Sequence, residues 1–360
     1  MVSTKNKLLL TPKDFEPSFK EWKIKGVFNP GAIRLKNNKI LLLVRVAEKA
    51  GHSHGKKLIC PVFTSREDFE LKYKKLHEKN KRIGAWNRFY LKDGACNLPT
   101  ISHLKKVLLS EDGFTIEKIY NEPAFFGTED DGEYGVEDPR IVKIGNEYYM
   151  TYVSISRFNG VSTSLAKSKD FGNWNREGLI FSEQNKDCVL FPEKIGGKYV
   201  ALHRPEGFFD FRKPSIWISY SPDLIYWGRE KSIMQPRPNS WDSERIGAGP
   251  PPIRTDKGWL LIYHGVSKKG RAIVYSVGAA LLDLKDPSKI IARSPKNRPL
   301  IFPKENYEKK GYIRNVIFPT GIVQTLDKEW VLIYSGGADR VVSVHKLKIK
   351  DIINHLRFLE

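Results

Sequence analysis

The chain has 360 residues and a formal net charge of +20, with 61 lysine and arginine residues against 41 aspartate and glutamate residues. No apolar run is long enough for a membrane span, and the first residues lack the apolar segment of a secretory signal, so we expect a cytoplasmic protein without a membrane partner. Cys60, Cys96 and Cys188 lie far apart without metal-ligand spacing, which argues against a disulfide framework and a structural zinc site.

The basic surplus has three interpretations: a lysine-rich surface, an anionic small substrate, or nucleic acid. The lysines are spread along the chain, and no helix-turn-helix, zinc-finger or RNA-binding signature accompanies them. We therefore expect no nucleic acid partner. A homo-oligomer remains open.

One kind of apolar run returns five times in chain order, each time as a polar turn, an aliphatic or aromatic strand and a polar residue at the strand's end. The runs are Asn37–Arg45, Gly145–Ser154, Gly196–Arg204, Asp256–His264 and Asp327–Ser335. A repeated strand unit is typical of propeller blades. The sequence thus predicts an all-β fold, a five-bladed β-propeller over residues 1–360 as one catalytic domain. The alternative is a pair of β-sandwiches, which does not explain the five-fold return.

Three further features refine this prediction. Ser168–Trp174 and Ser221–Trp227 share a Ser-x-Asp-φ-x-x-Trp pattern, whose tryptophan is expected to wedge between neighbouring sheets. The long gap between Arg45 and Gly145 predicts an insertion. Residues 350–359 have apolar residues near helical spacing, which predicts a short C-terminal helix.

The segment Gly135–Arg140, Gly-Val-Glu-Asp-Pro-Arg, stands just before the second run. Proline disfavours helical backbone in the residue before it, so Pro139 predicts an extended Asp138 on a stiff support. Such a carboxyl suits a catalytic acid. The alternative is a turn with a local Asp–Arg ion pair.

In a propeller, equivalent strand ends meet around one axis although they lie far apart in sequence. The central cavity would then collect one supported carboxyl together with several cations, hydroxyls and amides: Asn29, Arg45, Asp138, His203, Arg204, Arg245, Tyr263, His264 and Asp339. Singly, each is weak evidence, and a histidine at a strand end is more often structural. Together they form a polar cluster where buried strands would favour apolar residues.

Several arginines in one concave site favour an oxyanion ligand, because the guanidinium donors match phosphate or carboxylate. Phosphate is already a nucleophile, so phosphorolysis of a glycoside needs only one protein acid, to protonate the leaving oxygen. A hydrolase needs a second carboxyl to activate water or attack carbon. The candidates for that role are Glu137, Glu193, Glu206 and Glu244. No nucleophile elbow, P-loop or dinucleotide fingerprint occurs, so we expect no cofactor beyond inorganic phosphate as co-substrate, and no metal.

An ordered set of motifs resembles glycoside hydrolase family 130, the β-mannoside phosphorylases and related mannosidases. The motifs are Phe28–Gly31, Leu42–Glu48, Gly135–Arg140, Leu190–Lys194, Leu202–Pro205, Trp241–Gly249, Gly258–Gly265, Gly278–Leu284 and Gly336–Asp339. The resemblance implies an inverting phosphorylase that cleaves β-mannosides with inorganic phosphate and releases α-mannose 1-phosphate. It also implies that Asp138 is the general acid, acting through the 3-hydroxyl of the mannosyl unit.

The remaining roles also follow from the resemblance. It implies phosphate contacts for Arg45, Arg204, Arg245, Tyr263 and His264, and substrate contacts for Asn29, Glu137, Arg140, Glu193, His203 and Asp339. Glu193 stands where many 1,4-linkage phosphorylases carry arginine, so the chain looks more like the members that act on β-1,2-linked mannosides. The family also contains β-1,2-mannosidases, and a hydrolase that uses Glu193 and Glu244 is the alternative.

Overall fold

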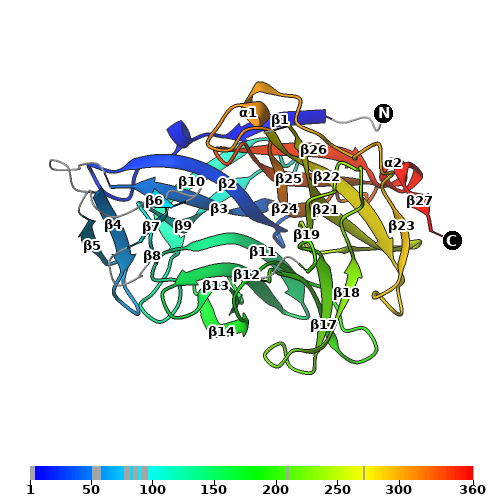
Figure 1. The fold of residues 1–360 in the computed structure, drawn as a ribbon, viewed down its shortest axis with the longest axis horizontal. Coiled ribbons are helices and arrows are strands. Elements are labelled where there is room, and N and C mark those ends of the chain that lie inside the picture. Colours follow the sequence, from blue (N-terminus) through cyan, green and yellow to red (C-terminus); the bar gives the residue numbers. More distant parts are fainter. Residues whose placement is uncertain are drawn as a thin grey trace.

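The computed structural model describes residues 5–50, 58–76, 82–83, 88–90, 96–207, 211–270 and 272–359. Five sheets of four or more strands dominate these residues, and their strands fan around a common centre (Figure 1). The predicted five-bladed propeller is therefore confirmed. Among the described residues, no helix has the length and apolar character needed to cross a bilayer.

Each blade is an antiparallel sheet whose strands mostly follow in chain order. Blade 1 contains β2 (Lys23–Arg34), β3 (Ile40–Lys49), β9 (Thr100–Leu109) and β10 (Ile116–Phe125). Blade 2 contains β11 (Val136–Ile144), β12 (Glu147–Ser156), β13 (Gly160–Ser168) and β14 (Asn175–Phe181). Blade 3 contains β15 (Asn185–Leu190), β16 (Tyr199–Pro205), β17 (Ile216–Ser221) and β18 (Gly228–Met234).

Blade 4 includes a strand from the C-terminal part of the chain, and blade 5 includes one from the N-terminal part. Blade 4 contains β19 (Arg245–Ala248), β21 (Gly258–Lys269), β22 (Ala272–Leu282) and β23 (Ile290–Arg293), with β20 (Ile253–Thr255) paired to β21 and β27 (Arg357–Phe358) paired to β23. Blade 5 contains β24 (Ile317–Gln324), β25 (Trp330–Gly337), β26 (Val341–Lys348) and β1 (Lys5–Leu10). In Figure 1 the blue β1 lies beside the red β26.

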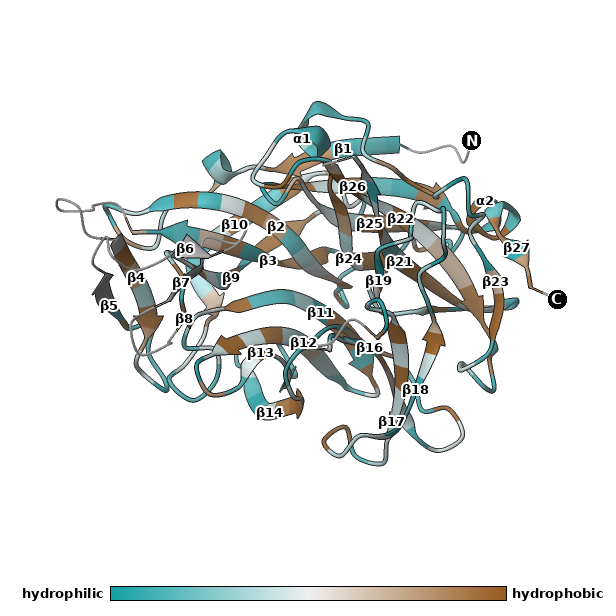
Figure 2. Ribbon diagram, viewed as in Figure 1, coloured by the Kyte–Doolittle hydropathy of each residue, from teal (hydrophilic) through white to brown (hydrophobic). Residues whose placement is uncertain are grey.

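Hydrophobic residues fill the space between neighbouring blades. The five largest clusters of buried apolar side chains each join two adjacent blades: 5 with 1, 3 with 4, 4 with 5, 1 with 2, and 2 with 3. In Figure 2, brown hydrophobic and teal hydrophilic segments both occur along strands such as β2 and β11. Burial of this apolar surface closes the ring and leaves polar side chains for its centre.

The five repeated runs form the second strand of each blade, namely β3, β12, β16, β21 and β25. The first strands lie nearer the centre, where β2 contacts β11 and β24, and β15 contacts β11 and β19. We expected the repeated runs to line the cavity, but the first strand of each blade lies nearer the centre, one strand inward from the repeated run. The second strands are the most apolar because they pack on both faces, which is why their pattern is the one visible in the sequence.

The two Ser-x-Asp-φ-x-x-Trp segments form equivalent turns between the third and fourth strands of blades 2 and 3. Ser168 and Asp170 accept backbone N–H groups of the first turn, and Ser221 and Asp223 do the same in the second. Trp174 packs on the cluster between blades 1 and 2, and Trp227 on the cluster between blades 2 and 3. The predicted wedging of these tryptophans between sheets is confirmed.

The insertion and the short helices lie outside the blades. The predicted insertion follows β3 and contributes β4 (Leu58–Phe63), β5 (Leu71–Leu76), β6 (Arg82–Ile83), β7 (Arg88–Tyr90) and β8 (Cys96–Asn97). A 3₁₀ turn, η1 (Pro12–Asp14), follows β1, and α1 (Asn306–Lys309) precedes β24. The C-terminal helix α2 (Ile349–His355) is shorter than predicted, because the chain becomes extended and pairs as β27 with β23.

Candidate active site

The first strands of blades 1, 2 and 3 are kinked at equivalent places. Strand pairing shifts register around Asn29 in β2, around Asp138 in β11 and around Asp187 in β15, and these residues have φ values of 49°, 51° and 54°. Asparagine and aspartate tolerate this left-handed backbone better than other residues with a Cβ. A bulge changes the direction of a side chain locally, so the side chains of Asn29, Asp138 and Asp187 are redirected in the same way near the centre.

The extended backbone predicted for Asp138 is thus wrong. Proline at 139 does disfavour helical backbone before it, but the bulge opposite Val153 and Thr151 imposes a positive φ instead. Asp138 nevertheless lies inside a strand, is followed by Pro139, and is only 7 % exposed.

One group of polar residues surrounds this carboxyl, and we call it the Asp138 group: Asn29, Arg45, Glu137, Asp138 and Asp339. Asn29 Nδ2 and Arg45 Nη1 donate to Asp138 Oδ1 at 2.8 and 2.9 Å, and the other guanidinium nitrogen of Arg45 binds Glu137. The Arg45 guanidinium also lies 4.5 Å from the centre of the Phe28 ring, which fixes its plane.

The pKa values in the Asp138 group diverge. Although burial alone would raise it, the charges of Arg45 and Arg140 and the bond from Asn29 lower the pKa of Asp138. Burial raises the pKa of Glu137 against the opposing charge of Arg45. Burial also raises the pKa of Asp339 to about 7, with a further contribution from the charge of Asp138. Neighbouring carboxyls whose pKa values are pushed apart are typical of proton-transfer sites.

A second set of residues is basic, and we call it the Asp187 group: Arg140, Asp187, Arg204, Glu206, Arg245 and His264. Arg140 joins the two groups, since it donates to the backbone oxygen of Asp138 at 2.8 Å and to Asp187 Oδ1 at 3.0 Å. Arg204 forms ion pairs with Asp187 and, at 2.6 Å, with Glu206. These charges, chiefly that of Arg204, overcome the effect of burial and lower the pKa of Asp187 to about 2.

His264 is a neutral donor in the Asp187 group. Burial lowers the pKa of His264 to about 3. Its Nε2 lies 3.1 Å from Arg204 Nη1. Because arginine only donates, Nε2 accepts and the ring proton is on Nδ1. His264 Nδ1 and Arg204 Nε are buried and have no hydrogen-bond partner among the described residues. Buried donors without an acceptor suit an anionic ligand.

Two cations, Arg245 within this group and Lys186 beside it, form no ion pair with a described carboxylate. The positive charge of Arg245, at the start of β19, acts to lower the pKa of its neighbours Glu206, His264 and Tyr275. Lys186, next to Asp187, acts in the same way on Glu137, Glu206 and Asp339. Both are half-buried. Lys186, Asp187 and Tyr275 were not predicted from the sequence.

Three predicted site residues lie elsewhere. The Tyr263 hydroxyl donates to Asp242 at 3.0 Å and accepts from Arg293 at 3.0 Å, in the interior of blade 4. His203 binds Asn185 and Ser219 and stacks on a phenylalanine ring. Glu193 lies in the turn after β15, where it pairs with Arg254 at the surface. The structure does not bring these three side chains to the two groups.

The two misplaced strand residues have one physical cause. Successive side chains of a strand point to opposite faces, so only one of the neighbours Tyr263 and His264, and one of His203 and Arg204, can face the centre. In both pairs the second residue does so. Glu193 is misplaced because it lies beyond the end of β15 that is remote from Asp187.

Gly247 in β19 permits the close packing of the Asp187 group. A Cβ at this position would overlap Asp187 Oδ2 and the His264 ring. We expect Gly247→Ala to destabilise the protein by about 1–3 kcal/mol, as overpacking does. Gly228→Ala is the matched control, because no atom lies within 4 Å of its added Cβ. Thermal unfolding of both variants tests this, and equal stability would contradict the packing.

Among the described residues, no group of three or more histidine, cysteine, aspartate or glutamate side chains is arranged to hold a metal ion. The site combines one carboxyl held between an amide and an arginine with a neighbouring basic group that has unsatisfied donors.

Comparisons with known proteins place this geometry in a family. The model of glycoside hydrolase family 130, described as β-1,4-mannooligosaccharide phosphorylase, matches residues 90–358. The β-1,2-mannobiose phosphorylase of Listeria innocua is 35% identical over 97% of this chain and 96% of its own length. The 1,2-β-oligomannan phosphorylase of a Thermoanaerobacter species is 44% identical over 68% of this chain and 78% of its own length.

Comparison with solved structures leads to the same family. The β-1,2-mannobiose phosphorylase from Listeria innocua, in complex with β-1,2-mannobiose, matches with a TM-score of 0.85 and 34% identity over 96% of both chains. The family model covers most of the chain and the similarity to the Listeria protein runs almost end to end, so the protein belongs to glycoside hydrolase family 130.

Proposed function

We propose that the protein is an inverting phosphorylase of β-1,2-linked mannosides, which uses inorganic phosphate and releases α-mannose 1-phosphate. The observation that carries this proposal is the pairing of one stiffly held carboxyl, Asp138, with a basic group whose buried donors on Arg204 and His264 have no acceptor. The names of the most similar relatives support the β-1,2 linkage.

In the proposed reaction a phosphate oxygen attacks the anomeric carbon on the face opposite the leaving group. The bond from phosphorus-bound oxygen to carbon forms as the glycosidic carbon–oxygen bond breaks, and the configuration inverts. The proton of the Asp138 carboxyl passes through the 3-hydroxyl of the mannosyl unit to the leaving oxygen. Arg204, Arg245 and His264 hold the phosphate by charge and by hydrogen bonds.

Asp138 must be protonated to act, whereas its neighbours lower its pKa in the free enzyme. Bound phosphate raises the pKa of Asp138 again, because a negative charge nearby raises the pKa of a carboxyl. Binding of the nucleophile thus prepares the acid. Asn29 and Asp339, which belong to the Asp138 group, are proposed to hold sugar hydroxyls.

The hydrolase alternative needs a second carboxyl free to activate water. Glu137 is bound to Arg45, Glu206 to Arg204, Glu193 to Arg254, and Glu244 to Lys213 and Lys268. Each is engaged by a cation, and this favours phosphorolysis.

The deciding experiment is incubation of β-1,2-mannobiose with the protein, with and without inorganic phosphate. We expect turnover only with phosphate, one equivalent of mannose 1-phosphate per bond cleaved, and the α configuration by proton NMR. Equal turnover without phosphate, with free mannose as the sole product, would establish the hydrolase instead.

The raised pKa of Asp339 makes a separate prediction about stability. Its folded pKa of about 7 lies above the ordinary value of 3.8, so its contribution to stability is fully present at low pH and is lost as pH rises through 7. Asp339→Asn removes this loss, and asparagine also tolerates the φ of 51°. Because each pKa unit corresponds to about 1.4 kcal/mol, we expect the variant to gain on the order of 4 kcal/mol over the wild type between pH 4 and pH 8.

Thermal unfolding from pH 4 to pH 9 measures this difference. Asp256→Asn, in an exposed turn, is the control and should differ from the wild type equally at every pH. A difference between Asp339→Asn and the wild type that does not change with pH would contradict the shifted pKa.

A further inference from the structure

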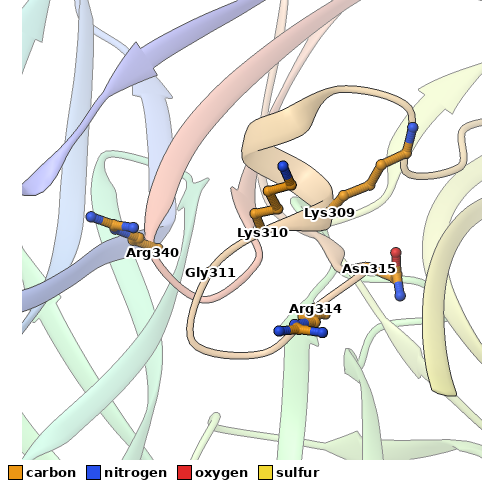
Figure 3. A pocket seen from close by; sticks show the side chains of 6 residues that line it. All are labelled: Lys309, Lys310, Gly311, Arg314, Asn315 and Arg340. Carbon is orange, nitrogen blue, oxygen red and sulfur yellow. The ribbon is translucent and has the colours of Figure 1, made fainter. Parts of the chain in front are cut away.

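A pocket of about 590 Å³ lies at the end of α1, and we call it the cationic pocket (Figure 3). Its walls are the end of α1, the loop that leads to β24, and the turn between β25 and β26. The lining residues are Lys309, Lys310, Gly311, Arg314, Asn315 and Arg340. Four of the six are cations, and none is a carboxylate.

The positive charge of the cationic pocket is not neutralised locally. None of its four cations forms an ion pair with a described carboxylate, and all four are exposed. The acidic residues nearest in sequence face other groups. Glu308 accepts the backbone N–H groups of Lys304 and Glu305 and lies 3.5 Å from His345. Asp339 acts on the Asp138 group.

The cationic pocket adjoins the site at two points. The backbone oxygen of Asn315 accepts the backbone N–H of Tyr275 at 2.9 Å. The centres of the Tyr275 and His264 rings are 6.0 Å apart, and His264 belongs to the Asp187 group. Arg340 directly follows Asp339 of the Asp138 group. The segments that line the pocket are therefore connected to both groups, by a backbone hydrogen bond to Tyr275 on one side and by the chain itself on the other.

We propose that the cationic pocket binds the phosphate group of the reactants at the entrance to the site: inorganic phosphate before the reaction, and the phosphate of the sugar 1-phosphate after it. This inference rests on the proposed function. A concave surface lined by one sign of charge raises the local concentration of counter-ions and speeds their association. Lysine and arginine together supply only donors, which suit phosphate oxygens.

The alternative occupant is the uncharged remainder of an oligosaccharide. Sugar subsites normally combine hydrogen-bond acceptors with aromatic platforms. Among the lining residues only Asn315 carries a side-chain acceptor, and none is aromatic. The chemistry of the pocket therefore favours the anion.

The test is the triple variant Lys310→Gln, Arg314→Gln and Arg340→Gln, none of which belongs to the two catalytic groups. At low ionic strength we expect KM for phosphate in phosphorolysis, and KM for mannose 1-phosphate in synthesis, to rise about 5- to 20-fold, with kcat within twofold of the wild type. Added salt should raise both KM values of the wild type but leave those of the variant nearly constant.

The matched control removes the same charge from the opposite face. Lys36, Lys257 and Lys328 are exposed in turns at the far ends of the blades, and their triple glutamine variant should keep both KM values. A rise in either KM for the pocket variant alone supports phosphate recognition, and the arm affected identifies the free or the sugar-bound phosphate. Unchanged KM values in both arms, or a rise only in KM for longer mannosides, would overturn the proposal.

A binding measurement separates this proposal from the proposed function. If the wild type has no phosphate-dependent turnover, the proposed function fails, and titration with inorganic phosphate followed by calorimetry still tests the pocket. Weaker binding by the pocket variant than by the control variant supports the pocket. Equal binding by the two overturns it.

Discussion

Asp138→Asn should lower kcat/KM for phosphorolysis of β-1,2-mannobiose by about 10²–10⁴-fold, the usual contribution of a general acid. The fold should survive, because Arg45 keeps its ion pair with Glu137 and asparagine tolerates the left-handed backbone at 138. The amide oxygen can still accept from Asn29. Steady-state kinetics and a thermal unfolding curve measure the two effects separately.

A change of substrate shows whether the loss concerns proton transfer. A nitrophenyl β-mannoside has a leaving group that departs without protonation, so Asp138→Asn should retain most of its activity on it. Equal losses on the two substrates would mean that Asp138 positions the sugar and is not the acid.

Asp187→Ala should be the most destabilising single substitution at the site. Asp187 forms ion pairs with Arg140 and Arg204, and its Oδ2 lies 3.6 Å from His264 Nε2. It is only 1 % exposed. Removing one partner of a buried ion pair costs about 3–5 kcal/mol, because the remaining charges stay buried without compensation. The φ of 54° adds strain for alanine. We expect a melting temperature about 5–10 °C lower.

Its control is Asp256→Ala, which removes an exposed carboxylate in a turn and should change the melting temperature by less than about 1 °C. The destabilisation should also be partly reversed by saturating phosphate, since a ligand that binds only the folded state stabilises it. A variant as stable as the wild type would mean that the ion pairs of Asp187 contribute little to the folded state.

The fold could be predicted because the second strand of each blade is apolar on both faces and leaves a repeated pattern. The first strands could not be assigned from the same pattern. β19 has only four residues, and β2, β11 and β15 are interrupted by the bulges at Asn29, Asp138 and Asp187. Bulged, polar strands carry no two-residue hydrophobic period, so sequence periodicity does not detect them.

The site was predictable where a motif marks it and less so elsewhere. Asp138 and Arg140 follow from the Glu-Asp-Pro-Arg segment, and Arg204 and His264 from the ends of repeated strands. Lys186 and Asp187 have no such mark, because their neighbours are ordinary strand residues. Their place depends on how blade 3 packs beside blade 2, which a single sequence does not encode locally.

The pairing of β1 with β26 has a consequence for synthesis of the protein. β1 is synthesised long before β26, its partner in blade 5, so Lys5 cannot pair with Lys346 until the intervening chain has been made. Until then Leu9 and Leu10, which end in the cluster between blades 5 and 1, stand without their partners. Contacts so distant in sequence are slow to form, and an unpaired strand can aggregate. The nascent chain is therefore prone to aggregate at the junction of blades 5 and 1. A protein fused before β1 would be attached at the outer edge of blade 5.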